Sequence, residues 1–163
     1  MVAALQACAT GPDADKVAAA CQALGNFANA DNRAALVADG ALPALLAAQR
    51  AHAGHAGVNA KFCAALGRLA YENAANAAAI VALDGALPAL LAAQRAHAGH
   101  ADVNRWFLYA LWLITKAAGP QRAHTKAAVE ACGALAVARA VMQQFSADDG
   151  IQDYGKLLLA QFA

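Results

Sequence analysis

Apolar side chains recur at intervals of three and four residues in the second half of the chain, at Val103, Phe107, Ala110, Leu111 and Ile114. This spacing is typical of an α-helix with one buried face, because residues three and four apart share a side of the helix. Three other segments follow the same frame, so we predict four long helices: Val17 to Ala28, Val58 to Ala70, Val103 to Lys116 and Ile151 to Phe162. Aligning their ends places four residues in register at spacings of 42, 45 and 48: Asn26, Arg68, Leu113 and Gln161.

An internal repeat connects these helices. The segment from Gly40 to Ala56 returns unchanged from Gly85 to Ala101, which is 45 residues later. A short helix is expected before each first glycine, because Gly adopts the left-handed conformation that ends a helix and the Leu-Pro that follows suits the first turn of another. This second helix is expected to run to Gly54 or Gly99. The predicted breaks between a short helix and the next one are Gly40, Gly85 and Gly133.

Self-similarity at a period of this size indicates stacked units that bury their apolar faces against one another. Each unit is predicted to hold a short helix, a second helix and a long helix. The boundaries expected within a single domain are a partial unit 1–31, a unit 32–75, a unit 76–120 and a degenerate C-terminal unit 121–163. The abundance of Ala, which favours helix and permits close packing, adds to this prediction of an all-α fold without a sheet.

Composition narrows the function classes. Hydrophobic residues make up 61% of the chain, but the longest bulky uncharged run, Trp106 to Thr115, is shorter than the roughly 20 residues of a membrane span. A net charge of +1 gives no general attraction to nucleic acids or anionic membranes. The four cysteines lie far apart without a C-x-x-C pair, which is typical of free thiols in a reducing compartment. We therefore expect an intracellular, cytoplasmic protein.

The start of the chain was considered as a targeting signal. Leu5-Gln-Ala-Cys8 is similar to a lipoprotein cleavage site, but a basic region and a long apolar core are missing before it. Secretion is therefore not expected.

Two segments resemble the armadillo-repeat family. Asp39 to Leu46 and Leu83 to Leu91 look like the junction between its first and second helices, and Ala23 to Ala28 looks like the end of its third helix. HEAT repeats are the near alternative, but they have two helices per unit, and the short Gly-terminated helix before each Leu-Pro favours armadillo. The resemblance covers nearly the whole chain. It implies a right-handed α-solenoid of about three and a half three-helix repeats.

In armadillo proteins the third helices line a concave groove, where an Asn near the end of each commonly holds the backbone of an extended peptide. The resemblance implies this role for Asn26, while Arg68, Leu113 and Gln161 depart from the pattern. The position one turn earlier, often Trp in the family, also varies along the chain: it carries Gln22, Ala64, Tyr109 and Leu157.

Polar and aromatic residues on the long helices form the candidate peptide-binding site. Their spacings of three, four and seven residues put them on one stripe of each helix. The candidates are Gln22, Asn26, Asn29, Lys61, Arg68, Tyr71, Trp106, Tyr109 and Lys116. Aromatics and Arg are enriched at binding hot spots, and the three cations suit an acidic or aromatic-acidic partner. The alternative is that the two aromatics of the third stripe fill the core, Trp106 above all.

Other chemistry has little support in the sequence. His52-Ala-Gly-His55 and His97-Ala-Gly-His100 lack a neighbouring acidic residue or Cys, so we expect no metal, and each pair is assigned to a helix end. Asp148 or Ser146 is expected to cap the last helix rather than to belong to a calcium loop. Hydrolase and nucleotide-binding motifs are lacking, and neither an enzyme nor a cofactor is expected.

The sequence therefore predicts a protein–protein interaction module or scaffold that binds a peptide segment in its groove. A first alternative is a structural subunit or a piece of a longer array that associates through its ends, since Met1 to Leu5 and Lys156 to Ala160 look too apolar to face water. A second is RNA binding by helical repeats, which requires base-reading side chains at fixed positions of each unit. Here those positions change from unit to unit.

Overall fold

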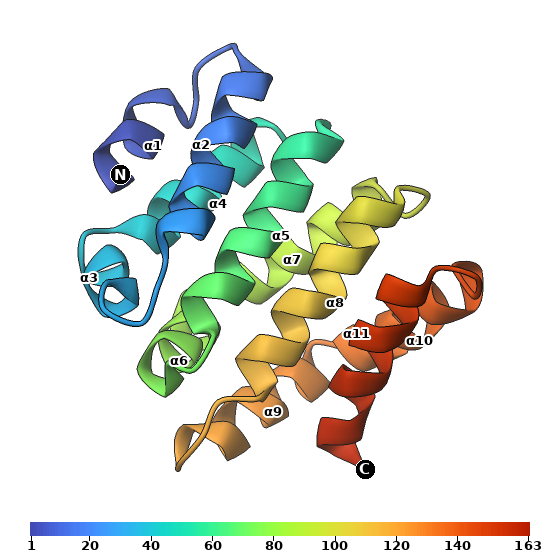
Figure 1. The fold of residues 1–163 in the computed structure, drawn as a ribbon. Coiled ribbons are helices and arrows are strands. Elements are labelled where there is room, and N and C mark those ends of the chain that lie inside the picture. The colour runs from blue at the N-terminus through green and yellow to red at the C-terminus, as the bar shows by residue number, and fades with distance from the viewer.

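The computed structural model describes residues 1–163, and 76% of them are helical, with no strand. The all-α prediction is thus confirmed (Figure 1). The elements are α1 (Val2–Cys8), α2 (Ala14–Phe27), α3 (Arg33–Ala38), α4 (Ala41–Ala51), α5 (Ala56–Ala70), α6 (Ala74–Ala82), α7 (Ala86–Ala96), α8 (Ala101–Thr115), α9 (Gln121–Ala131), α10 (Ala134–Gln144), α11 (Asp149–Leu159) and the 3₁₀ turn η1 (Ala160–Phe162).

The four long helices of the prediction are α2, α5, α8 and α11. They lie side by side in chain order, with α4, α7 and α10 behind them (Figure 1). Their N-cap residues are Asp13, His55, His100 and Asp148, which repeat the spacings of 42, 45 and 48 residues. The predicted register is therefore confirmed, although each helix begins two or three residues earlier than expected.

The predicted glycine breaks are also confirmed. Gly40, Gly85 and Gly133 have φ values of 91°, 88° and 77°, and each directly precedes a second helix. An L-residue with a side chain seldom adopts this conformation, whereas Gly does so without strain. The helix before the last break, α9, has 11 residues and is thus not short, in contrast to the six residues of α3.

The second helices end earlier than expected. They stop at Ala51 and Ala96, three residues before Gly54 and Gly99. The reason lies in the following long helix, because the side-chain amide of Asn104 donates to the carbonyls of the loop. These bonds satisfy the loop backbone without another helical turn.

Small residues let the first three long helices approach closely. A Cβ at Gly25 would lie 3.2 Å from Cα of Ala65, and a Cβ at Gly67 would lie 3.2 Å from Cα of Ala110. Between α8 and α11 the corresponding space holds Trp112, which occupies the position of these glycines in the register. Beneath the long helices runs one continuous core, whose largest fully buried side chains include Phe62 and Phe107.

The ends of the chain are less apolar on the surface than their sequences suggest, so the prediction of exposed apolar ends is largely wrong. Val2 and Leu5 are buried, because α1 packs on α2 and α4, and Leu158 is buried beside α8. Met1 and Leu157 remain exposed. No single helix combines the length and the apolar character of a membrane span; α6 with α7 meets that test only as a pair bent by 78°.

Candidate functional site

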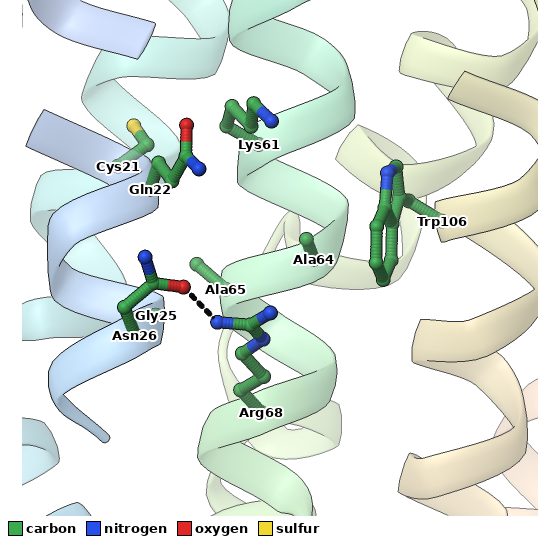
Figure 2. Close-up of a pocket in the computed structure, with 9 residues that line it drawn as sticks. All are labelled: Cys21, Gln22, Gly25, Asn26, Lys61, Ala64, Ala65, Arg68 and Trp106. Atoms are coloured by element: carbon green, nitrogen blue, oxygen red, sulfur yellow. Dashed lines mark hydrogen bonds between the residues drawn. The ribbon is translucent and has the colours of Figure 1, made fainter. Parts of the chain in front are cut away.

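A pocket opens where α2, α5 and α8 lie side by side, and five of the predicted binding residues line it (Figure 2). They are Gln22 and Asn26 from α2, Lys61 and Arg68 from α5, and Trp106 from α8. Cys21, Gly25, Ala64 and Ala65 complete the lining, and the cavity volume is about 70 Å³. The stripe expected from helical spacing thus becomes one site across three consecutive long helices. We call this site the polar pocket.

Small residues make the polar pocket. Gly25 and Ala65 keep α2 and α5 close, while Ala64 has no side chain long enough to cover the space above it. The longer side chains then stand around this gap as its walls. The Trp106 ring faces the pocket from α8; it is half-buried and also packs against the hydrophobic core, so the interpretation of Trp106 as a core residue holds only in part.

Arg68 joins the polar pocket to the aromatic residues beside it. Its Nη1 donates a hydrogen bond to Oδ1 of Asn26 across the α2–α5 boundary. The guanidinium also lies beside the hydroxyl of Tyr109. Burial raises the pKa of Tyr109 above its ordinary value of 10.0, and the positive charge of Arg68 opposes this rise. Arg68 and Tyr109 therefore share one surface, as predicted.

Four aromatic rings follow the polar pocket on α8 and α11, and we call them the aromatic cluster: Trp106, Tyr109, Trp112 and Tyr154. Tyr109 contacts the other three edge-on, with ring centroids 5.2 to 6.2 Å apart. Trp112 and Tyr154 stack at 5.9 Å with an angle of 23° between their planes. All four side chains are partly exposed, so the cluster offers ring surface to a partner.

Tyr71 and Lys116 extend this surface at the C-terminal ends of α5 and α8. The Lys116 ammonium lies 5.7 Å from the centroid of Tyr71 and 5.2 Å from that of Trp112, which are cation–π distances. The Arg33 guanidinium lies over the same tyrosine at 5.0 Å. A hydrogen bond from the phenol to Glu72 raises the pKa of Tyr71. Glu72 has a φ of 48°, which is uncommon for a residue with a side chain.

The ninth candidate, Asn29, lies apart from the pocket lining. It follows α2, where its N–H donates to Oδ1 of Asn32 and its own Oδ1 accepts from the N–H of Asp31. Asn29 therefore stabilises the turn that follows α2. Leu113 on α8 and Gln161 in η1 occupy the register position of Asn26. Leu113 is buried and Gln161 accepts a hydrogen bond from Arg122, so neither repeats the peptide-binding role that the resemblance implies for Asn26.

The sequence reasoning missed three members of this surface: Arg33, Trp112 and Tyr154. A signal existed for two of them. Trp112 follows Tyr109 by three residues, and Tyr154 is 48 residues after Trp106, which is the spacing between the N-caps of α8 and α11. Arg33 begins the short helix α3 and therefore lies outside the candidate stripes of the long helices. Only the fold brings it over Tyr71.

The two His-Ala-Gly-His segments connect α4 to α5 and α7 to α8. His55 caps α5 by accepting from the N–H of Val58, and Nε2 of His97 lies 2.8 Å from the carbonyl oxygen of Ala53. Nowhere do three His, Cys, Asp or Glu side chains come together as a metal site would require. Asp148 caps α11, as predicted, by accepting from the N–H of Ile151.

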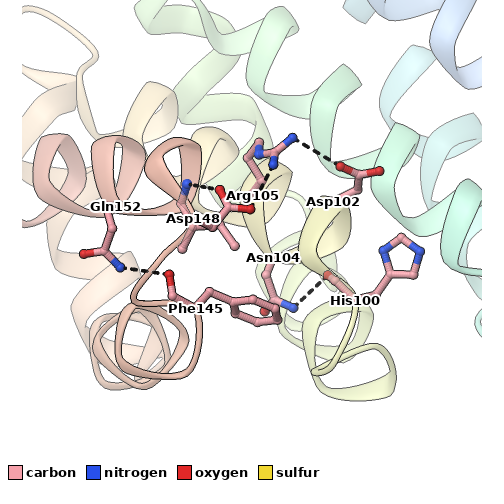
Figure 3. A network of polar contacts seen from close by, with 8 residues as sticks. His100, Asp102, Asn104, Arg105, Phe145, Asp148 and Gln152 are labelled. Atoms are coloured by element: carbon pink, nitrogen blue, oxygen red, sulfur yellow. Dashed lines mark hydrogen bonds and ion pairs between the residues drawn. The ribbon is translucent and has the colours of Figure 1, made fainter.

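A polar network holds α11 against α8 (Figure 3). Arg105 donates to Asp148 at 2.9 Å and to Asp102 at 3.3 Å. The pKa of Asp148 is lowered, first by the hydrogen bond from the Ile151 N–H and further by Arg105. Nearby, the Gln152 amide donates to the carbonyl of Met142 in the last turn of α10 and to that of Phe145, which caps α10. These contacts position α11 against α8.

Comparisons with known proteins were made at three levels. No family model matches this chain, and neither a curated protein nor a solved structure matches it.

Proposed function

We propose that the protein is an interaction module that holds an extended segment of a partner protein along its long helices. The observation that carries this proposal is the polar pocket, which is built from three consecutive long helices and continues into the aromatic cluster. Such a surface offers hydrogen-bond donors, charge and ring area in sequence along one direction. Those are the features that an extended peptide can use residue by residue.

The arrangement of the units fits an armadillo-like right-handed α-solenoid. Support comes from the register of the four N-caps and from the order of helices around Gly40 and Gly85. In a solenoid of this kind each unit contacts only its neighbours, and the strongest packing here is α2 with α5, α5 with α8, and α8 with α11. In this proposal the long helices form the concave face.

A binding role is favoured over catalysis by the chemistry of the polar pocket. Its nucleophilic groups are the Lys61 amine and the Cys21 thiol, and burial raises the pKa of that thiol to about 12, so the thiol stays protonated at neutral pH. No carboxylate or imidazole lines the pocket to act as a general base. The remaining side chains can donate hydrogen bonds or stack, which is what recognition needs.

Selection from a library of random displayed peptides tests the proposal. Peptides selected on the wild-type protein should compete with one another, and Lys61→Ala with Arg68→Ala should weaken them about tenfold, as loss of a hot-spot contact does. The matched control is Arg95→Ala with Arg139→Ala, which removes the same charge from exposed positions of α7 and α10. Failure to select any competing set, or equal losses in both double variants, would refute the proposal.

One observation favours self-assembly as a second candidate function. Phe27 is 49% exposed at the end of α2, whereas Leu69 and Ile114, at the same distance from their N-caps, are fully buried. A second copy of the chain could cover this ring. Sedimentation of the wild type and of Phe27→Ser between about 1 and 100 µM tests this idea. A concentration-dependent increase in mass that the substitution abolishes supports it, and a monomer throughout refutes it.

A further inference from the structure

The polar pocket has an uncompensated positive charge. Lys61 and Arg68 both line it, and neither has a carboxylate oxygen within 4.0 Å, since the ion pairs of the chain involve only Arg105 and His55. None of the nine lining residues is acidic. From this we infer that the polar pocket binds a side-chain carboxylate, from an Asp or Glu of the bound segment. The inference rests on the proposed function and names the chemistry that it selects.

The hydrogen-bond donors in the pocket are oriented for such a group. Arg68 donates one hydrogen bond to Oδ1 of Asn26. A guanidinium has five N–H donors, so others remain for a ligand. The same contact turns the amide nitrogen of Asn26 away from Arg68 and towards Gln22, as Figure 2 shows. Donors from α2 and α5 therefore flank one space. A carboxylate accepts several hydrogen bonds at once and donates none, so it fits a site whose lining supplies cationic and amide donors and no carboxylate.

The size of the pocket limits what can enter it. Its volume of about 70 Å³ corresponds to roughly two water molecules at their liquid volume of about 30 Å³ each. A carboxylate group is small enough to enter this space. An aromatic residue of the same segment would instead lie on the outer face of Trp106 and Tyr109, which belong to the aromatic cluster.

The location of the two cations favours one carboxylate at a defined position over negative charge spread along the whole bound segment. Lys61 and Arg68 lie seven residues apart on α5, so they project from the same side of one helix. Lys116, the other candidate cation, is already placed over Tyr71 and Trp112, and it lies at the far end near Glu72. Two of the three candidate cations thus lie together at the polar pocket.

The test uses two acetylated and amidated eight-residue peptides, one alternating Glu with Thr and one alternating Gln with Thr. Binding is followed by NMR through the side-chain amides of Gln22 and Asn26 and the indole of Trp106, which detects affinities into the millimolar range. We expect the Glu peptide to shift these signals with a dissociation constant at least tenfold lower than that of the Gln peptide. Raising the salt concentration should weaken the Glu peptide selectively.

Variants make the result specific to the pocket. Lys61→Gln and Arg68→Ala should each remove most of the Glu preference, while Arg95→Ala with Arg139→Ala should leave it unchanged. Because Lys61 is only half-buried and makes no hydrogen bond within the protein, Lys61→Gln keeps the test decisive even where Arg68→Ala impairs folding. Arg68→Lys should restore part of the preference, since it keeps the charge but loses the planar fork.

Three outcomes would overturn the inference. Equal binding of the Glu and Gln peptides at the pocket would leave the interaction module in place but remove the carboxylate site. A phosphoserine peptide that binds more than tenfold tighter than the Glu peptide would assign the pocket to phosphate instead. Equal losses in the pocket variants and in the Arg95 and Arg139 control would show nonspecific attraction. Failure of the library selection as well would refute the proposed function itself.

Discussion

The two halves of the proposed binding surface are built in opposite ways. In the polar half, α2, α5 and α8 approach through Gly25 and Gly67, and the space beside Gly25 stays open as the polar pocket. In the aromatic half, α8 has Trp112 at the position of those glycines, and its ring stacks on Tyr154 of α11. The register of the helices is thus the same in both halves, while the residue at this position differs in size.

This difference has a consequence for function as well as packing. The hollow half exposes donors around a small cavity, so it can select an anionic group by hydrogen bonding. The filled half exposes ring edges and faces, which contribute buried area with little discrimination between sequences. Affinity and specificity are therefore expected from different ends of the same surface.

The largest effect is expected from emptying the filled half. Trp112→Ala should lower the free energy of unfolding by about 3 kcal/mol, because it removes the ring that stacks on Tyr154 and carries Lys116. Urea denaturation followed by circular dichroism measures this. A loss below about 1 kcal/mol would mean that the rings lie on the surface without packing the α8–α11 boundary. Trp112→Phe, which keeps a ring, should lose less than half as much.

Alkaline pH should act mainly on the polar half. Burial raises the pKa of Cys21 from 9.0 to about 12 and raises that of Cys63 as well, so the folded state keeps both protons while the unfolded chain loses them. Stability is thus fully present below about pH 9 and falls as the pH rises further, by about 2 to 3 kcal/mol between pH 8 and pH 10 for the two thiols together. Cys21→Ala with Cys63→Ala should flatten this dependence; an equally steep curve would assign it to other groups.

Adding a side chain where α5 and α8 approach most closely should also destabilise the protein. Gly67→Val should lower the free energy of unfolding by about 2 kcal/mol, because its Cβ would lie 2.7 Å from Cδ1 of Tyr109 and 3.2 Å from Cα of Ala110. Gly54→Ala is the matched control, since nothing lies within 4 Å of its added Cβ, and it should change stability by less than about 0.5 kcal/mol. Similar values for both variants would show that α5 and α8 do not depend on this close contact.

The smallest effect is expected where the two halves meet. Arg68→Ala should raise the pKa of Tyr109 further, because the guanidinium favours the phenolate and its removal leaves burial unopposed. Ultraviolet absorbance of the phenolate, titrated in Tyr71→Phe with Tyr154→Phe so that Tyr109 is the only tyrosine, measures the shift. An unchanged or lowered pKa would show that Arg68 does not face Tyr109 in solution.

The same contacts revise one expectation about the pair Arg68 and Tyr109. The sequence predicts that Arg68→Ala with Tyr109→Ala weakens binding by at least ~2 kcal/mol and leaves the melting temperature nearly unchanged. In the structure the Tyr109 ring lies against Gly67 and contacts three other rings. Removing it should therefore also lower stability, so Arg68→Ala alone is the cleaner probe of binding.

Much of the candidate site could be predicted because helical periodicity assigns residues to faces. Gln22, Asn26, Lys61 and Arg68 were placed on one stripe by spacing alone, and they line the polar pocket. Asn29 could not be excluded, because the pattern does not show that α2 ends at Phe27 and that Asn29 belongs to a turn. Which chain ends are covered also escaped prediction, since the burial of Val2 and Leu5 depends on how α1 packs on α4.

The repeated segment separates what the sequence determines from what the tertiary structure decides. Both copies have a left-handed glycine before the second helix, and both bury a Gln–Asn hydrogen bond of 3.2 Å, at Gln49 with Asn59 and Gln94 with Asn104. These features are local, because the interacting groups lie within about three helical turns of one another along the chain. The repeated segment and the Val-Asn that follows each copy, at 58–59 and 103–104, therefore produce them twice.

The outward groups of the two copies have different fates. Nε2 of His97 bonds to the carbonyl oxygen of Ala53 in the preceding unit, whereas Nε2 of the equivalent His52 is buried without a partner. The carbonyl of Ala98 accepts from Gln144 instead of from a histidine. Such contacts depend on which helices pack together, because groups far apart in the sequence become neighbours only when the chain has folded. The sequence alone determined the helices, their breaks and their faces; the tertiary structure decided which of those faces became a joint and which became the polar pocket.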